Sequence, residues 1–555
     1  MAQPLPGLAR ELVEAGLLGR DQARVLLEEQ RRTTKSLEEL VVSFGFLDNR
    51  VLHDFLRHQN QTRIFCPQTF QVDPVLVATF PFEKALETQS FPLRLENGVL
   101  DAALVDVHNV TSLDALAQAF PACTRVEAHL TPLDAFLERL DEAYGRRVDL
   151  SYLLASLEAT PASQDSIHDG RSTAQNFADA ILTKAVRERA SDIHMEPDQV
   201  FVRVRLRIDG VLRPAVTFHK DLWPSICVCL KIMAGLNIAQ NRLPQVGRFT
   251  KDVVGRTVDF RVSIHPTQHG ESVVLRLLDR LHGLKPLADL GFSIDQVDLL
   301  KRALQCADGM ILLTGPTGSG KTTTLYSMLD YLGMGSRNIM TLEEPIEYSL
   351  PGVRQSEVRE SSGITFPEGV RSILRQDPDI ILIGEIRDED TATMAVRAAM
   401  TGHLVLSTLH TNDTLGVVQR LKDLGLDPHL LEGHLVCLVA QRLVRRLCPS
   451  CKEETPQCAQ GMGYVATGCE ACLFTGYKGR FAIGEVLPMT LALEGKLIQG
   501  DAKATLLSYL KENGIETLWE RGMAAVRDGH TSFEEVVRVV RSQEWQKEDH
   551  GAVSL

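Results

Sequence analysis

The sequence has no apolar run as long as the roughly 18 residues of a membrane helix, and its first residues lack the charged-then-apolar order of a secretory signal. Both absences favour a cytoplasmic protein that does not itself span a membrane. A surplus of basic residues is also missing, since 72 Asp and Glu against 59 Lys and Arg give a formal net charge of −13. A protein that coats nucleic acid needs a basic face, so the charge argues against nucleic acid as the main partner.

The composition is otherwise ordinary, with 44% hydrophobic and 24% charged residues in a chain of 555. This length is enough for roughly three or four domains that each bury a core. The chain also contains 11 cysteines. Cysteines of a cytoplasmic protein are thiols or metal ligands more often than disulfide partners, so their number favours free thiols and a metal site.

The most informative stretch is a phosphate-loop pattern near the middle of the chain. Residues 310–314 are an apolar run typical of a buried strand, residues 315–322 fit G-x-x-x-x-G-K-[ST], and a helix is predicted from Thr323 to Tyr331. Glycines let consecutive N–H groups point at a phosphate, and the helix adds the positive end of its dipole. Lys321 is expected at the β- and γ-phosphates, and the Thr322 hydroxyl at Mg²⁺. The predicted nucleotide-binding residues are Gly315, Thr317, Gly318, Ser319, Gly320, Lys321, Thr322 and Thr323.

A repeat lies within residues 1–61, the predicted first module. Leu8, Leu12, Gly16, Leu18, Ala23, Leu27 and Gln30 recur 29 positions later as Leu37, Val41, Gly45, Leu47, Leu52, Leu56 and Gln59. The apolar spacing predicts two units of helix, glycine turn and helix. They resemble the tandem motifs of the domain that binds cyclic di-GMP in some secretion and pilus motors. Those motifs begin Arg-Leu-Gly, where this chain has Gly7 and Ser36 in place of the arginine and Glu38 after Leu37. We therefore expect a helical docking module without that ligand.

Residues 62–145 are predicted to form a small α+β domain. Short helices alternate there with strand-like runs such as Phe91 to Leu95 and Val99 to Val105. The stretch resembles the second N-terminal module of the same motors, which serves docking and not catalysis. Residues 146–173 read as a polar linker that ends at a helix start.

A cluster of arginines marks the next predicted domain, residues 174–285. A helix from Asn176 to Arg189 precedes a strand in which alternation places Arg203, Arg205 and Arg207 on one face. Such a face is either solvated with scattered ion pairs or meets an anion. In an oligomeric ATPase, a neighbouring domain could bring Arg203 and Arg205 to the γ-phosphate, so we expect these two to assist catalysis.

Several segments together resemble the GspE/PilB ATPases of type II secretion and type IV pilus assembly. They are residues 190–197, 203–213, 231–235, 242–245 and 266–271, and with the motor region the resemblance covers about residues 176 to 545. Val246 is a departure, since these motors commonly have Asp there. The resemblance implies a cytoplasmic homohexamer that uses ATP and Mg²⁺, sits peripherally at the inner membrane, and meets an inner-membrane platform protein and a cytoplasmic docking protein. Residues 286–555 would be its α/β RecA-like P-loop ATPase domain.

Three further segments carry polar residues next to predicted strands of that domain. Glu343, Glu344 and Glu347 follow an apolar run as an acidic turn, where three carboxylates make little sense as core. The family has an equivalent acidic segment in which Glu344 replaces an Asp, and the resemblance implies that Glu344 and Glu347 assist catalysis by positioning water or metal. A solvated acidic turn is the alternative. Glu385 follows residues 380–383, and carboxyl ends of parallel strands lie beside bound nucleotide. The family resemblance implies that Glu385 polarises the attacking water. Whether Glu385 also helps to hold Mg²⁺ is left open. Arg387 is the next candidate for charge pairing.

The third segment ends in a histidine. Residues 401–410 resemble the family's histidine box, which senses the γ-phosphate. We favour His410 over His403, because His410 lies at the predicted carboxyl end of the strand. A lone histidine is otherwise more often structural than catalytic.

Four cysteines form the other strong pattern. Cys448, Cys451, Cys469 and Cys472 make two C-x-x-C pairs 17 residues apart. Such pairs can close tetrahedrally around Zn²⁺ through thiolate bonds, and Cys458 between them is expected to be spare. The flanking residues 441–447 and 476–480 match the zinc-bearing region of secretion and extension motors, which retraction motors generally lack.

The sequence thus predicts an ATPase motor that powers protein secretion or pilus extension, without separating the two. An alternative is a nucleotide-gated docking or signalling switch that reads a second messenger through the N-terminal repeat. A nucleic-acid translocase shares the motor fold but is disfavoured by the acidic charge.

Overall fold

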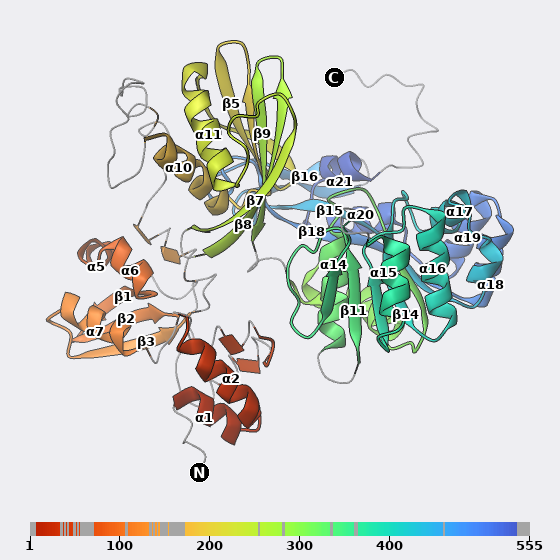
Figure 1. Cartoon of the computed structure of the whole chain (residues 1–555), viewed down its shortest axis with the longest axis horizontal. Helices are drawn as coiled ribbons and strands as arrows, with labels where there is room; N and C mark the ends of the chain where they lie inside the picture. Colours follow the sequence, from red (N-terminus) through yellow and green to blue (C-terminus); the bar gives the residue numbers. More distant parts are fainter. Residues whose placement is uncertain are drawn as a thin grey trace. The chain divides into compact units, whose positions relative to one another are not determined.

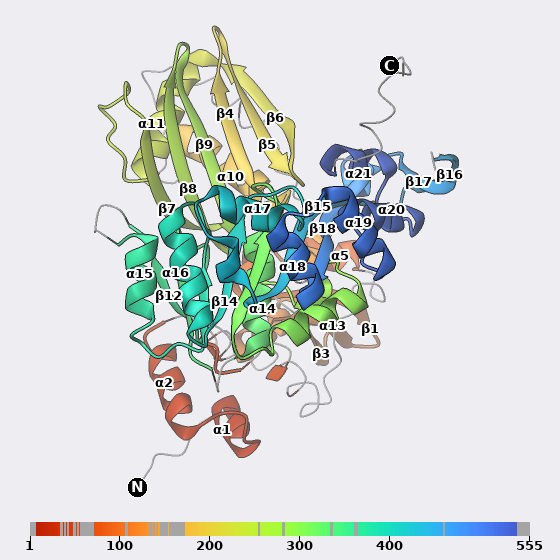
Figure 2. The same cartoon turned by 90° about the vertical axis from the view of Figure 1, so that its right-hand side faces the viewer.

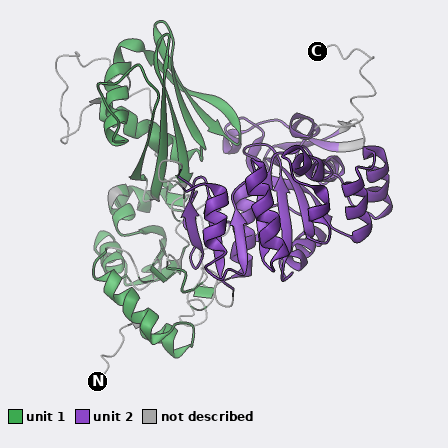
Figure 3. Cartoon of the chain, turned by 45° about the vertical axis from the view of Figure 1, so that its right-hand side comes forward, with its two compact units in different colours: residues 1–281 green, residues 282–555 purple. Residues whose placement is uncertain are grey.

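The computed structural model describes residues 7–33, 72–105, 109–131, 173–253, 256–279, 284–333, 337–359, 364–458 and 461–540, with one to four residues at a time between 37 and 55 and between 136 and 154. Most of the predicted linker 146–173, and the tail beyond residue 540, lie outside the described residues. The chain divides into two compact units, residues 1–281 and 282–555 (Figure 3). Among the described helices, none has the length and apolar character needed to cross a membrane.

The N-terminal repeat is visible in its turns. Helix α1 (Gly7–Glu14) leads through Gly16 to α2 (Arg20–Gln30). Gly16 has a φ of 72° and its repeat partner Gly45 a φ of 67°, values that favour glycine. The turns also share hydrogen bonds, since Leu17 N–H donates to the Leu12 carbonyl and Phe46 N–H to that of Val41, each at 3.0 Å. Both units contribute to one core of Ala9, Leu12, Leu18, Ala23, Leu26, Leu37, Leu40, Val41 and Leu52. Glu38, Leu56 and Gln59 lie outside the described residues.

The next module is a three-stranded sheet with helices. Its elements are α5 (Pro74–Thr79), α6 (Phe82–Glu87), β1 (Ser90–Glu96), β2 (Val99–Leu104), α7 (Val110–Ala119) and β3 (Arg125–Leu130). Strand β2 pairs antiparallel with β1 and parallel with β3. The predicted strands at 91–95 and 99–105 correspond to β1 and β2. A core that includes Phe80, Phe91 and Phe136 packs beneath the sheet.

A six-stranded antiparallel sheet follows, in the order β6-β5-β4-β9-β8-β7. Its elements are α10 (Thr173–Arg187), β4 (Asp192–Pro197), β5 (Phe201–Ile208), β6 (Val211–His219), η1 (Lys220–Leu222), α11 (Trp223–Met233), β7 (Gln245–Val253), β8 (Arg256–Thr267) and β9 (Gly270–Asp279). Helices α10 and α11 cover one face, where the inward residues of the strands form the core (Figure 1). Along β5, buried residues alternate with Arg203, Arg205 and Arg207, which confirms that the arginines share the other face.

The second unit is built on a seven-stranded sheet in the order β12-β11-β13-β14-β10-β15-β18. The strands are β10 (Gly309–Thr314), β11 (Ile339–Glu343), β12 (Arg354–Glu357), β13 (Ile380–Ile383), β14 (Leu404–Leu409), β15 (Leu435–Leu447) and β18 (Tyr477–Pro488). The first six are parallel and β18 is antiparallel to β15. Carboxyl ends of the parallel strands therefore meet at one edge.

Helices cover both faces of this sheet, so its strands are apolar throughout. Alternate residues of the strands pack against α15 (Phe366–Ile373) and α16 (Glu389–Met400) on one face, and against α13 (Ile294–Ala303) and α14 (Lys321–Leu332) on the other (Figure 2). The remaining elements of the parallel region are η2 (Leu287–Asp289), α17 (Gly416–Asp423) and η4 (Pro428–Leu431). Helix α14 starts two residues before the predicted Thr323, since Gly320 caps it.

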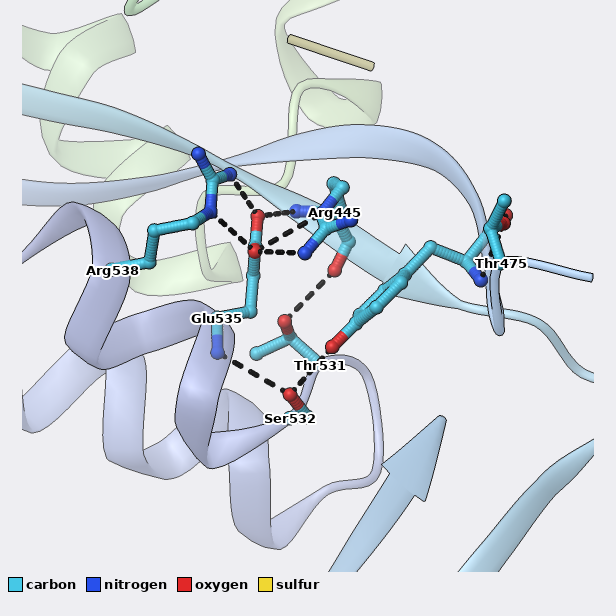
Figure 4. A network of polar contacts seen from close by, with 7 residues as sticks. Arg445, Thr475, Thr531, Ser532, Glu535 and Arg538 are labelled. Carbon is cyan, nitrogen blue, oxygen red and sulfur yellow. Dashed lines mark hydrogen bonds and ion pairs between the residues drawn. The ribbon is translucent and has the colours of Figure 1, made fainter. Parts of the chain in front are cut away.

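The cysteine segment lies between β15 and β18, and four helices follow it. The segment contains β16 (Lys452–Cys458), β17 (Gly461–Ala466) and η5 (Glu470–Cys472), and the helices are α18 (Leu491–Gln499), α19 (Lys503–Glu512), α20 (Leu518–Arg527) and α21 (Phe533–Val539). Ser532 caps α21 by accepting a hydrogen bond from Glu535 N–H. The buried Glu535 carboxylate accepts from the guanidinium groups of Arg445 and Arg538, and Tyr477 hydrogen-bonds Ser532 (Figure 4). This network fastens the final helix to both strands that lead to the cysteines.

Candidate nucleotide and metal sites

The phosphate loop connects the buried strand β10 to helix α14. Gly315 begins the loop, and a Cβ there would lie 2.6 Å from the Gln441 carbonyl oxygen, so a side chain does not fit. Gly320 ends the loop with a φ of 88°, a left-handed value that starts the helix at Lys321. Thr317, Gly318 and Thr322 are exposed, while Ser319 is buried. The loop therefore has the predicted strand, turn and helix around it.

The Lys321 ammonium lies along this loop. Its Nζ donates to the carbonyl of Gly315 at 2.7 Å and to that of Pro316 at 3.2 Å. Burial lowers the pKa of Lys321 to about 8, which the negative charge of Glu385 opposes and the positive charge of Arg442 assists. These contributions place Lys321 within electrostatic range of the carboxylate that follows β13.

Four polar side chains meet at the carboxyl ends of β11, β13 and β14. Arg387 donates to Glu385, and its other terminal nitrogen donates to Glu344 Oε2 at 2.8 Å. His410 Nε2 lies 3.4 Å from Glu385 Oε2. Burial raises the pKa of Glu385, but the hydrogen bonds and charges of Arg387 and His410 outweigh it and hold that pKa below its ordinary value. Glu385 is therefore an ionised carboxylate at neutral pH.

His403 lies at the opposite end of β14. Its Nδ1 is 2.9 Å from the Ala398 carbonyl oxygen, and Thr401 Oγ1 is 3.2 Å away. These contacts join the strand to the end of α16. The structure therefore brings His410 and not His403 to the edge where Glu385 lies.

The expectation that the carboxylates of Glu343, Glu344 and Glu347 are not core residues was wrong for Glu343. This side chain is only 3% exposed, as the last residue of β11. Its carboxylate accepts hydrogen bonds from the Tyr326 hydroxyl, from Thr341 Oγ1 at 2.6 Å and from Gln355 Nε2 at 3.1 Å. Three donors make burial of a carboxylate tolerable. Glu347 lies beyond it, with its backbone N–H donating to the Tyr326 hydroxyl at 3.4 Å.

The arginines of β5 belong to the other unit and differ in their partners. Arg205 pairs with Glu196 at 2.5 Å, and Arg207 lies 3.5 Å from Asp192. Arg203 makes no ion pair with any residue that the structure describes; its guanidinium carbon lies 5.4 Å from the centre of the Phe201 ring. The ion-pair interpretation thus fits Arg205 and Arg207, whereas Arg203 is exposed.

The four predicted cysteines converge. Their sulfur atoms lie within 4.8 Å of one another, with Cys448–Cys469 at 3.9 Å and Cys451–Cys472 and Cys469–Cys472 at 3.8 Å. A tetrahedron with Zn–S bonds of about 2.3 Å has edges of about 3.8 Å, so the thiols fit zinc. Backbone N–H groups of Cys469 and Gly476 approach the Cys472 sulfur at 3.2 Å, as suits a thiolate. The Cys458 side chain lies outside the described residues.

Sequence reasoning missed two residues of β15 that touch the phosphate loop. Gln441 and Arg442 are 1% and 8% exposed in the middle of this strand. Arg442 donates to the carbonyls of Gln441 and of Asn412, at 2.9 and 2.8 Å. Two long polar side chains inside an apolar strand were the available signal, since such groups need partners when buried.

The fold and the phosphate-loop edge together define an α/β RecA-like ATPase. The chain belongs to the family described as type II/IV secretion system proteins, whose model matches residues 168–538. A second model, the MshEN domain, matches residues 62–150. The family identification from sequence is therefore confirmed.

Individual relatives agree with this assignment. The chain is 37% identical to the type IV pilus assembly ATPase PilB of Myxococcus xanthus, over 96% of this chain and 98% of that protein. It is 43% identical to type II secretion system protein E of Dickeya dadantii, over 73% and 83%. PilB of Thermus thermophilus is 36% identical over 92% of this chain, which spans 59% of that relative.

A solved structure supports the fold. The ATPase DotB of Legionella pneumophila superimposes with a TM-score of 0.51 and 21% identity, over 66% of this chain and 95% of DotB.

The depressed pKa of Lys321 predicts how nucleotide affinity depends on pH. The ammonium attracts phosphate only when protonated, and its pKa is about 8. We expect the dissociation constant for ADP to be flat near neutrality and to rise toward tenfold per pH unit above the pKa. A fluorescent-nucleotide titration series from about pH 6.5 to about pH 9.5 measures this. In Lys321→Arg the guanidinium stays charged across this range, so the variant should bind ADP more weakly but with a dissociation constant that does not change with pH. An equal pH dependence in the variant and the unchanged chain would show that Lys321 is not its cause.

Proposed function

We propose that the chain acts as a homohexameric ATPase that powers type II protein secretion or type IV pilus extension. The observation that carries the proposal is the meeting of Glu344, Glu385, Arg387 and His410 beside the phosphate loop and Lys321. Phosphoryl transfer from a bound nucleotide needs a residue that positions the attacking water and cations that neutralise the phosphate charge, and this edge supplies both. The relatives named for pilus assembly and for secretion support the choice of these two processes.

Each residue at the edge has a proposed role. The N–H groups of the loop and Lys321 hold the β- and γ-phosphates, and Thr322 places Mg²⁺, which would neutralise charge on the phosphates. The ionised Glu385 orients and polarises the attacking water. Arg387 keeps Glu385 and Glu344 at fixed positions, Glu347 supports the acidic turn, and His410 senses the γ-phosphate. No covalent enzyme intermediate is expected.

Assembly is proposed because the motor unit needs a further cation. Arg203 has no carboxylate partner among the described residues, and a subunit of the same kind could present it to a neighbour's nucleotide, with Arg205 beside it. The arginine-bearing domain also exposes apolar side chains within a short stretch, which favours a protein contact there. They are Val228, Ile232, Ile238, Leu243 and Val246.

The proposed mechanical step follows from binding and hydrolysis. Closing around ATP and opening after hydrolysis would rotate the arginine-bearing domain against the motor domain. We propose that this stroke turns or lifts an inner-membrane platform protein, while the N-terminal modules dock to a cytoplasmic partner. The chain would then work in the cytoplasm, at the inner membrane through its partners, without nucleic acid.

Variants at the edge test the chemical roles. Lys321→Ala should weaken nucleotide binding about 100-fold or more, because the phosphates lose a buried charge. Glu385→Gln should bind ATP as the unchanged chain does but hydrolyse it at least about 100-fold more slowly. Binding and steady-state turnover measure the two effects separately. Normal turnover by Glu385→Gln would refute its role, and Arg10→Ala in the N-terminal module serves as the matched surface control.

Assembly has its own test. We expect turnover per chain to rise with protein concentration in step with formation of a hexamer, measured by light scattering on the same samples. Arg203→Ala should assemble yet lose activity, and mixing it with Glu385→Gln should restore part of the activity, because mixed rings contain some complete sites. Activity in a monomer that ignores concentration would contradict assembly and favour the nucleotide-gated switch.

We also propose that Zn²⁺ occupies the four thiols as a structural ion. Purified chain should carry about one zinc by mass spectrometry of the metal, and Cys448→Ser or Cys472→Ser should lose most of it. Loss of the ion should also lower the unfolding temperature, since metal binding is coupled to folding. Cys123→Ser, outside the cluster, should keep its zinc; equal loss in all three variants would refute the site.

A further inference from the structure

Gln441 contacts the phosphate loop through both ends of its side-chain amide. Its Nε2 donates to the Ser319 carbonyl at 2.8 Å, and its Oε1 accepts from Thr324 Oγ1 at 2.8 Å. The Ser319 carbonyl can only accept, so the amide has one orientation. The side chain is 1% exposed, and both of its polar atoms are therefore satisfied inside the protein.

These contacts fall on either side of the junction between loop and helix. Ser319 precedes Gly320, the residue that caps α14, and Thr324 is buried in the first turn. The Ser319 carbonyl and the Gly320 N–H belong to one planar peptide and point in opposite directions. Fixing the carbonyl toward β15 therefore fixes the N–H in the direction away from β15, and N–H groups of such a loop are the donors that a bound phosphate receives.

The backbone of Gln441 is equally close to the start of the loop. A Cβ on Gly315 would lie 2.6 Å from the Gln441 carbonyl oxygen, and one on Gly320 would lie 2.9 Å from Gln441 Nε2. The same carbonyl accepts a hydrogen bond from Arg442 Nη1 at 2.9 Å. Gln441 thus lies against both ends of the loop, and glycine at each end permits this approach.

We propose that Gln441 is a positioning residue that holds the phosphate loop in its phosphate-binding shape. The inference rests on the proposed function, because it assigns this side chain to the same nucleotide site. It touches no substrate atom and acts through the peptide between Ser319 and Gly320. A loop released at that peptide would lose part of its preorganisation, so binding of phosphates should weaken more than turnover at saturation.

Gln441→Leu removes both hydrogen bonds at nearly constant volume. We expect its dissociation constant for ADP, and its KM for ATP, to rise about tenfold, while kcat changes less than about threefold. Val444→Ala is the matched control on the same strand, since Val444 is fully buried but packs away from the loop in a separate cluster. It should lower the unfolding temperature without changing KM.

Gln441→Glu supplies a second, independent variant should the leucine variant fail to fold. Its ionised carboxylate cannot donate to the Ser319 carbonyl, whereas the protonated acid can. The ratio of its ADP dissociation constant to that of the unchanged chain should therefore fall as the pH is lowered. A purely structural role for Gln441 would leave this ratio independent of pH.

Lys321→Ala, measured beside these variants, distinguishes failure of the proposed function from failure of the role proposed for Gln441. Failure of the unchanged chain to bind ADP would overturn the proposed function itself. If the unchanged chain binds ADP, Lys321→Ala does not, and Gln441→Leu binds normally, then only the role of Gln441 is overturned. A KM increase in Val444→Ala equal to that in Gln441→Leu would also overturn it.

Discussion

The parallel pairing of β11, β13, β14 and β10 is the constraint on which the rest of the motor unit depends. Parallel strands bring their carboxyl ends to one edge, so residues far apart in the chain meet there without any local pattern of their own. Glu385 and His410 are neighbours because β13 and β14 are hydrogen-bonded side by side. Because helices cover both faces of the sheet, the strand ends are where polar side chains that follow the strands can reach solvent.

Buried polar groups then fix the edge in detail. Glu343 ties β11 to α14 through Tyr326, Gln441 ties the phosphate loop to β15, and the buried Glu485 of β18 accepts from the Thr414 and Leu518 backbones. Burial raises the pKa of Glu485 despite these hydrogen bonds. Each such group would be costly without partners, and each joins segments that the apolar core alone would leave free to shift. The hydrogen bonds of these buried groups therefore set the relative positions of the segments around the site.

Local sequence patterns were sufficient to predict the sites whose functional residues lie close together in the chain. Gly315 to Thr322 lies in the predicted loop between strand and helix, and the cysteine pairs converge as their spacing indicated. Sequence patterns did not predict which polar side chains are buried, because their burial depends on partners far away in the chain. Glu343 looked like its neighbour Glu344, and the donors from Tyr326, Thr341 and Gln355 distinguish them. Gln441 was read as a flank of the cysteines, because its contact with Ser319 spans 122 positions.

The cations at this edge bear on the proposed role of Arg203. Lys321 lies along the loop, where it would meet the phosphates. The other two described cations there are already engaged, since Arg387 donates to two carboxylates and Arg442 to two backbone carbonyls. Charge that develops on a transferred γ-phosphoryl group needs a donor besides the loop lysine and Mg²⁺. Under the proposed function Arg203, exposed and without a carboxylate partner among the described residues, supplies that donor. An ATPase whose last donor comes from a different domain turns over only when that domain is in place. Such a requirement links hydrolysis to domain movement, as a motor needs.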